Sequence, residues 1–130
     1  MSVSQRPLSP HLQVYSWHLT MALSILHRMT GVFLSFGAVA LVIVLSSLAS
    51  GADAYSCVHD ALTHPIGLLF LFAWTFALYF HMANGVRHLV WDAGLGLGKK
   101  VASSSGWYVL AFAVLATVAS WLPMAMGALT

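Results

Sequence analysis

The sequence predicts an all-α membrane protein with three transmembrane helices in an up-down bundle. Of the 130 residues, 60% are hydrophobic, only 6% are charged and none is glutamate. Three stretches contain no charged side chain, over residues 29–52, 61–86 and 101–130. Each is longer than the roughly 20 residues that an apolar helix needs to cross a bilayer. Because little chain remains outside these stretches, we expect a single membrane domain over residues 1–130.

A short polar arm is expected first, over residues 1–20, because its prolines disfavour a continuous helix. The first transmembrane helix is predicted over about residues 21–48. A Ser-Gly-Ala-Asp run follows it and indicates an outer loop at about 49–64. Pro65 suits the first turn of the second helix, which we expect to continue to about residue 91.

The third helix is expected over about residues 106–126, after an inner loop at about 92–105. That loop contains several glycines and a Gly-Lys pair, but it lacks the spacing and the preceding strand of a phosphate-binding loop. Within the third helix, small residues at Ala113 and Thr117 permit close approach of a neighbouring helix.

Basic residues indicate the orientation in the membrane. They lie near the start of the first helix, at the end of the second helix and in the loop after it, at Arg6, Arg28, Arg87, Lys99 and Lys100. Residues 51–64 contain none, so the positive-inside rule places the N-terminus on the cytoplasmic or matrix side. Five scattered basic residues form no nucleic-acid-binding face, so we expect contact with membrane lipid and no nucleic acid. The single cysteine, Cys57, excludes an intrachain disulfide.

One polar stripe marks the end of the second helix, where residues 81–92 read His-Met-Ala-Asn-Gly-Val-Arg-His-Leu-Val-Trp-Asp. At 100° per residue, one helical face carries His81, Asn84, Gly85, His88 and Asp92. Because the first of these lies about ten residues, or roughly 15 Å, inside the membrane, its imidazole needs partners there. It either bonds a neighbouring helix or serves as an axial ligand of haem iron, with the glycine leaving room for the macrocycle. A second axial ligand would then come from another membrane subunit.

A second polar stripe opens the first helix, where Ser24, His27, Arg28 and Gly31 are spaced i, i+3, i+4 and i+7. The first helix starts on the side where the second helix ends. We therefore expect this stripe to line one pocket together with Arg87, His88 and Asp92.

The chemistry of this pocket has more than one interpretation. His27 and Arg28 could pair with haem propionates, or Ser24 and Arg28 could hydrogen-bond a quinone carbonyl. The arginine could also only extend to the membrane interface. Asp92 could pass protons inward, or it could cap the turn and pair with Lys99.

Three segments carry a resemblance to a known family. Residues 6–15, 24–31 and 81–92 closely resemble, in order and spacing, three signatures of the cytochrome b556 membrane-anchor subunits of succinate dehydrogenase, respiratory complex II. The resemblance implies a subunit in the bacterial plasma membrane or the mitochondrial inner membrane. It also implies three partners, namely a second small anchor subunit, with which it shares haem b, an iron–sulfur subunit and a flavoprotein subunit.

The resemblance also implies roles for individual residues. His81 falls on the axial haem ligand, and Ser24 and Arg28 fall on the ubiquinone site. His27 falls near a haem propionate, and Asp92 on a residue associated with proton delivery. His88, like His27 and Arg28, is a candidate for contact with a haem propionate or for the haem pocket.

The expected function is transfer of electrons from succinate to ubiquinone by an assembled complex. In that complex, this chain would dock the catalytic subunits and form part of the ubiquinone site. Two alternatives stay open: the haem b anchor of a quinol:fumarate reductase, and a small transport or proton-conducting subunit that uses His81, His88 and Asp92 as a relay.

Overall fold

The computed structural model describes residues 15–127, which form four helices: α1 (Leu19–Ser50), α2 (Ala52–Thr63), α3 (Pro65–Asp92) and α4 (Lys99–Ala125). Helices α1, α3 and α4 are long and apolar enough to cross a membrane. This confirms the predicted all-α membrane protein with three membrane-spanning helices. Most of the predicted arm, residues 1–14 with Arg6, lies outside the described residues.

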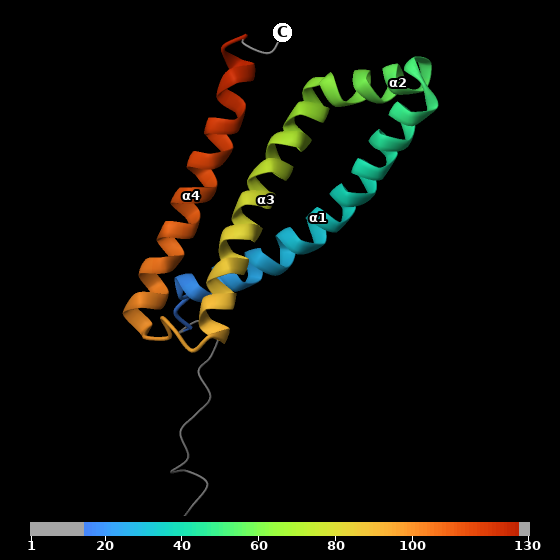
Figure 1. Cartoon of the computed structure of the whole chain (residues 1–130). Coiled ribbons are helices and arrows are strands. Elements are labelled where there is room, and N and C mark those ends of the chain that lie inside the picture. Colours follow the sequence, from blue (N-terminus) through green and yellow to red (C-terminus); the bar gives the residue numbers. More distant parts are fainter. Residues whose placement is uncertain (1–14, 128–130) are drawn as a thin grey trace, which may run out of the picture.

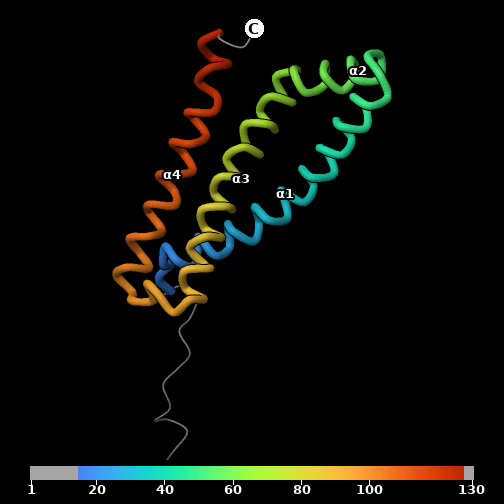
Figure 2. Tube along the Cα trace, viewed as in Figure 1, coloured from blue at the N-terminus to red at the C-terminus, as the bar shows by residue number. Residues whose placement is uncertain are grey.

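The three long helices are arranged unequally. Figure 1 shows α3 and α4 side by side, with α1 starting near their lower ends and then diverging upward. Figure 2 traces the same path and shows α2 lying across the far ends of α1 and α3. We call the end of the molecule with the turn between α3 and α4 the turn end, and the opposite end the α2 end.

The buried core lies where the three long helices meet. It consists of Leu23 from α1, Phe80 from α3, and Val109 and Ala113 from α4. The predicted role of small residues of α4 in close helix packing is confirmed, because Ala113 and Thr117 are 0% and 1% exposed. Most other apolar side chains face outward, where lipid or partner helices can cover them.

Hydrogen bonds between side chains also join α3 to α4 near the α2 end. The Tyr79 and Ser120 hydroxyl oxygens are 2.8 Å apart, and Trp121 Nε1 donates to Thr75 Oγ1 at 3.3 Å. Such bonds satisfy polar groups that would otherwise face apolar surroundings. Together with the core they fix α4 against α3.

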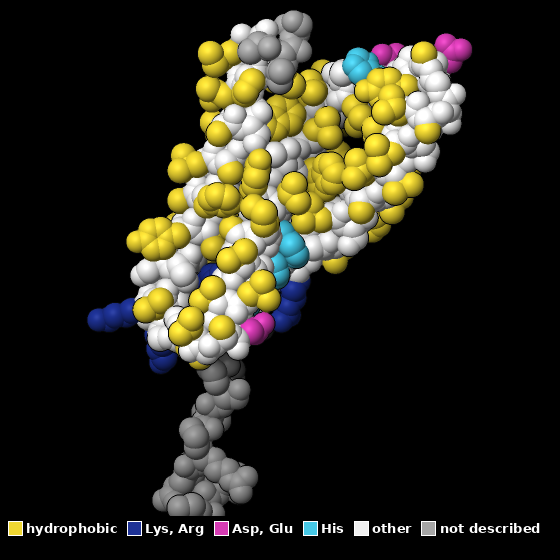
Figure 3. Space-filling model, in the orientation of Figure 1, with side chains coloured by type: hydrophobic (Ala, Val, Ile, Leu, Met, Phe, Trp, Pro, Cys, Tyr) yellow, Lys and Arg dark blue, Asp and Glu magenta, His cyan; other side chains and the backbone are white. Residues whose placement is uncertain are grey.

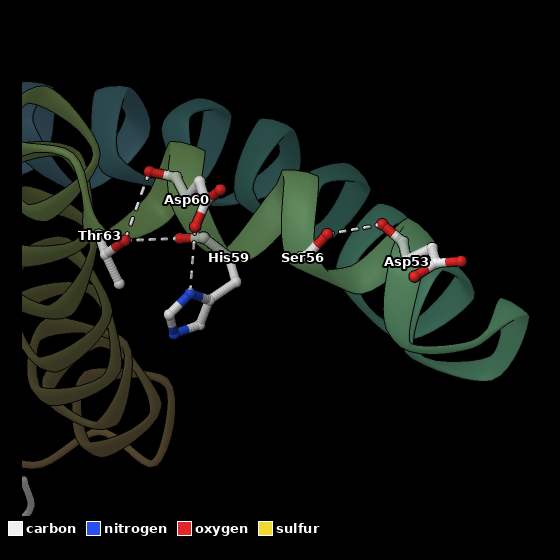
Figure 4. A network of polar contacts seen from close by, with 5 residues as sticks. All are labelled: Asp53, Ser56, His59, Asp60 and Thr63. Atoms are coloured by element: carbon white, nitrogen blue, oxygen red, sulfur yellow. Dashed lines mark hydrogen bonds and ion pairs between the residues drawn. The ribbon is translucent and has the colours of Figure 1, made fainter.

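The predicted outer loop at 49–64 is largely helical, because α2 occupies Ala52–Thr63. No glycine or proline interrupts this segment between Gly51 and Pro65. Its hydroxyl side chains bond their own helix: Ser56 donates to Asp53 O, and Thr63 to His59 O (Figure 4). The loop assignment relied on the Ser-Gly-Ala-Asp run, which does end α1 at Ser50 but is followed at once by α2 from Ala52.

The start of the last helix also differs from the prediction, because α4 begins at Lys99 and not near residue 106. Serine side chains in the added turns bond backbone carbonyls within the helix: Ser104 donates to Lys100 O and Ser105 to Ala102 O. These bonds satisfy the hydroxyls locally, so a polar serine run continues as helix.

Gly37 permits the close approach of α1 to Trp74 of α3, because a Cβ atom at this position would overlap the indole ring. We expect Gly37→Ala to destabilise the protein by about 1–3 kcal/mol through this overlap. The measurement is thermal unfolding of the detergent-solubilised protein. Gly85→Ala is the matched control, since its Cβ would meet only His27 Cε1 at an ordinary 3.8 Å. Equal stability of the two variants would contradict the prediction.

Candidate functional site

The two predicted polar stripes meet between α1 and α3. The rings of His27 and His81 are stacked, with centroids 4.0 Å apart and planes 11° apart. The His88 ring lies 5.2 Å from that of His27. An open groove of about 520 Å³, which we call the histidine groove, is lined by Ser24, His27, Arg28, Gly85, His88 and Leu89.

The histidine groove belongs to the half of the molecule near the turn end. Figure 3 shows histidine, basic and acidic side chains close together there, on a face that is otherwise mostly apolar. All lysines and arginines of the described residues lie on α1 near its start, on the last turns of α3, or at the start of α4. The predicted side of the membrane for this end remains a prediction.

His81 is held by the backbone of α1. Its Nδ1 lies 3.0 Å from His27 O and 3.3 Å from Thr30 Oγ1. A carbonyl oxygen only accepts hydrogen bonds, so Nδ1 carries the proton and donates. The Thr30 hydroxyl donates to carbonyls of its own helix, at Leu26 O and His27 O, so its oxygen can accept from the imidazole as well.

This arrangement selects one tautomer of His81. With the proton on Nδ1, Nε2 retains its lone pair, and no residue of the described chain bonds it. Fixing one ring nitrogen by a carbonyl is the usual way in which proteins orient a metal-binding histidine. The His81 side chain therefore has the form that a metal ligand needs.

Two glycines shape the contact between α1 and α3. A Cβ on Gly31 would lie 3.0 Å from His81 Cε1, so only glycine lets this ring lie against α1 without a shift. A Cβ on Gly85 would lie 3.8 Å from His27 Cε1, at an ordinary distance. Gly85 therefore contributes open space to the histidine groove, and the closer constraint is at Gly31.

His27 has one nitrogen without a partner. Its Nδ1 is buried, and no hydrogen-bond partner exists for it within residues 15–127. A buried polar atom left unpaired costs roughly 1–3 kcal/mol. A hydrogen-bonding group from outside this chain would remove that cost.

Arg28 lies beside both a polar and an apolar surface. It lines the histidine groove with the half-buried Ser24. It also lines an apolar groove of about 440 Å³ with Met29, Val32, Phe33 and Phe36. Its side chain is exposed and forms no hydrogen bond or ion pair with another described residue. A cation and a hydroxyl next to an apolar surface suit a ligand with a carbonyl oxygen and a hydrophobic body.

Arg87 does not lie in the pocket where the sequence placed it. It is 6% exposed and bonds α4 through Ser105 Oγ and Ala102 O. Asn84, assigned to the same face as His81, is fully buried and accepts from Arg87. Both residues lie on the face of α3 that packs against α4.

Asp92 occupies the exposed end of α3 and does not line the histidine groove. The predicted alternative of an ion pair with Lys99 is not found, since the one ion pair among the described residues joins His59 and Asp60 on α2. The structure thus brings Ser24, His27 and Arg28 together with His88, and leaves Asp92 beside them at the surface.

Sequence reasoning missed Thr30 and Trp91. Thr30 lies three residues after His27, so helical spacing could have placed it on the face of α1 that contacts the His81 ring. Trp91 follows His88 by three residues, and the two rings meet edge to face with centroids 5.1 Å apart. Trp91 also contacts Arg87, four residues before it on α3, so helical spacing could have indicated both of its contacts.

Comparison with known proteins agrees with the segments found in the sequence. Residues 2–120 match a family described as the succinate dehydrogenase/fumarate reductase transmembrane subunit. The mitochondrial succinate dehydrogenase cytochrome b560 subunit of Homo sapiens is 40% identical over 121 residues, which cover 88% of this chain and 69% of that protein. The succinate dehydrogenase cytochrome b556 subunit of Rickettsia conorii is 38% identical over 119 residues, covering 92% of this chain and 93% of that protein.

The matched region includes all of α1, α2 and α3, most of α4 and every residue of the histidine groove. A match of this extent, with relatives in both bacteria and mitochondria, confirms the resemblance stated from the sequence. This chain belongs to the family of succinate dehydrogenase/fumarate reductase transmembrane subunits.

Proposed function

We propose that this chain is the haem b-binding membrane anchor of a succinate:ubiquinone oxidoreductase. In the assembled complex it docks the iron–sulfur and flavoprotein subunits and contributes to the site at which ubiquinone is reduced. The names of its relatives, cytochrome b556 and b560 subunits of succinate dehydrogenase, support both the haem and the direction of the reaction. Its predicted location is the bacterial plasma membrane or the mitochondrial inner membrane, with the N-terminus on the cytoplasmic or matrix side.

The observation that carries this proposal is the bond from His81 Nδ1 to His27 O, at 3.0 Å. It leaves the Nε2 lone pair available, and imidazole is an axial ligand that haem iron accepts. A bound haem b would supply reversible one-electron chemistry at this position. The site lies on a half-exposed face of α1 and α3, so a second small anchor subunit can supply the opposite ligand and share the haem.

Other residues of the histidine groove suit the remainder of a haem. The unpaired Nδ1 of His27, the exposed cation of Arg28 and the His88 ring lie toward the turn end, and carboxylates such as propionates prefer that polar end of the site. We assign His27, Arg28 and His88 to this role.

Ser24 and Arg28 are also our candidates for the ubiquinone site. The arginine keeps its positive charge and can stabilise negative charge that develops on a quinone oxygen, while the serine hydroxyl can donate a hydrogen bond to it. The adjacent apolar groove suits a hydrophobic ring or tail. Asp92, exposed at the end of α3, is the candidate for proton delivery from the aqueous side.

The test is purification of the intact complex from native membranes through a tag on this chain. We expect haem b, covalently or tightly bound flavin, iron–sulfur protein and a second small membrane subunit in the same fraction, with succinate–ubiquinone reductase activity. A fraction without haem and these subunits would overturn the proposal and favour the transport alternative. Efficient fumarate reduction with a low-potential quinol, and weak ubiquinone reduction, would favour the fumarate reductase alternative.

A further inference from the structure

Arg87 is a buried cation whose partners are all neutral. Its Nε donates to Ser105 Oγ at 2.9 Å, one terminal nitrogen to Asn84 Oδ1 at 3.2 Å, and the other to Ala102 O at 2.5 Å. No carboxylate within the described chain pairs with it. Three bonds in different directions fix the plane of the guanidinium, which a lysine ammonium could not reproduce.

The fixed guanidinium lies against Trp91. Its Cζ atom is 4.0 Å from the centroid of the indole ring, in the geometry of a cation–π contact. This contact joins two residues of the same helix four positions apart. Because the guanidinium is anchored to α4, it holds the half-buried indole ring in one orientation.

Trp91 in turn contacts the residues of the histidine groove. Its ring meets His88 edge to face, with centroids 5.1 Å apart and an interplanar angle of 86°. On its other side His88 lies 5.2 Å from His27, which stacks on His81. A continuous series of ring contacts therefore runs from Arg87 to the proposed haem ligand.

The position of His88 depends on two neighbours. His27 limits the ring from the side of α1, and Trp91 limits it from the end of α3. No hydrogen bond from another described residue holds His88, so the aromatic contacts determine where its imidazole lies. A Trp91 ring free to rotate would release His88 toward the polar end of the groove.

We propose that Arg87 is a positioning residue for the histidine groove. Anchored to the first turns of α4, it holds Trp91 against His88 and thereby sets the arrangement of His88 and His27 around the bound haem and quinone. This inference rests on the proposed function. It gives α4, which contributes no residue to the groove, a defined effect on the site.

A simpler role would be that Arg87 only fastens α4 to α3. In that case substitutions would lower the amount of assembled complex, and each complex that formed would have native properties. A positioning role predicts altered properties per assembled complex. Trp91 separates the two roles, because it forms no described hydrogen bond to α4 and yet mediates the contact with His88.

The test compares three variants, Arg87→Lys, Trp91→Leu and Trp91→Phe, in the purified complex. The readouts are haem per complex, the electron paramagnetic resonance spectrum of the ferric haem, and KM and kcat for ubiquinone. We expect Arg87→Lys and Trp91→Leu to shift the haem spectrum and raise KM on the order of ten-fold, with kcat changed much less. Trp91→Phe, which keeps an aromatic face and edge, should restore values near those of the unaltered complex.

Two controls alter exposed residues of α4 that lie outside these contacts, and the second repeats the Trp→Leu change. Lys100→Gln removes an exposed charge at the start of α4, and Trp107→Leu removes a tryptophan that is 63% exposed. Both should leave the spectrum and KM unchanged. If Arg87→Lys fails to assemble, Trp91→Leu decides the question.

A native spectrum and native KM per haem in Trp91→Leu would overturn the inference, and so would a native Arg87→Lys complex. Absence of haem or quinone reduction in the unaltered complex would instead overturn the proposed function, so the two failures are distinguishable.

Discussion

Membranes containing the His81→Leu variant are expected to lose the native b-type signal in reduced-minus-oxidised spectra. Leucine fills a similar volume but offers no lone pair to iron, and it also removes the bond to His27 O, which is 3.0 Å long in the structure. A residue that supplies one of two axial ligands cannot be lost without changing the spectrum of the haem that remains. The measurement is a difference spectrum normalised to the amount of assembled complex.

The matched control for this prediction is His59→Leu, the same chemical change on exposed helix α2. His59 has one contact with a charged group, Asp60 at 3.7 Å (Figure 4). Its helix α2 lies at the end of the molecule opposite the turn end (Figure 1). Its variant should keep the full b-type signal. An unchanged signal in both variants would rule out His81 as the ligand.

The sequence predicted the three membrane helices because their evidence is local. Long runs without charge are sufficient to identify spans, and each of the three runs corresponds to one of α1, α3 and α4. Helical spacing also placed Ser24, His27 and Arg28 on one face, and the structure places all three on the histidine groove. Local geometry carries this information, so no tertiary contact is needed to obtain it.

The stacking of His27 on His81 was not predictable in the same way. A helical wheel gives the face on which a residue lies, but the contact between two rings depends on how closely and at what angle the helices cross. Here Gly31 allows the close approach. The sequence showed that the glycine shares the stripe, but it could not show which ring would occupy the space.

Arg87 and Asn84 show why the remainder of the site was misplaced. Helical spacing put Asn84 on the stripe of His81, and Arg87 was expected at the pocket because the end of the second helix lies beside the start of the first. In the structure α3 has a helix on two sides, and its polar residues divide between them: His81 and His88 turn to α1, whereas Arg87 and Asn84 turn to α4. Only the packing of α4 distinguishes the two sets.

Arg28→Leu is expected to abolish most succinate–ubiquinone reductase activity while leaving succinate oxidation with an artificial electron acceptor intact. The exposed Arg28 has no other bonding partner among residues 15–127, so its loss should not disturb the helix bundle. Removal of one preorganised group that stabilises negative charge on oxygen costs about 100-fold or more in rate. The two activities are measured on the same membranes.

Arg28→Lys tests whether charge alone is sufficient at this position. Lysine keeps the charge but loses the planar, forked donor set. We therefore expect ubiquinone reductase activity between that of the Arg28→Leu variant and that of the unaltered complex. Equal loss of both activities in Arg28→Leu would indicate failed assembly and would contradict the expectation that the helix bundle is undisturbed. Full ubiquinone reductase activity in Arg28→Leu would show that Arg28 does not belong to the quinone site. Ser24 would then be the one remaining candidate of the pair that lines the histidine groove.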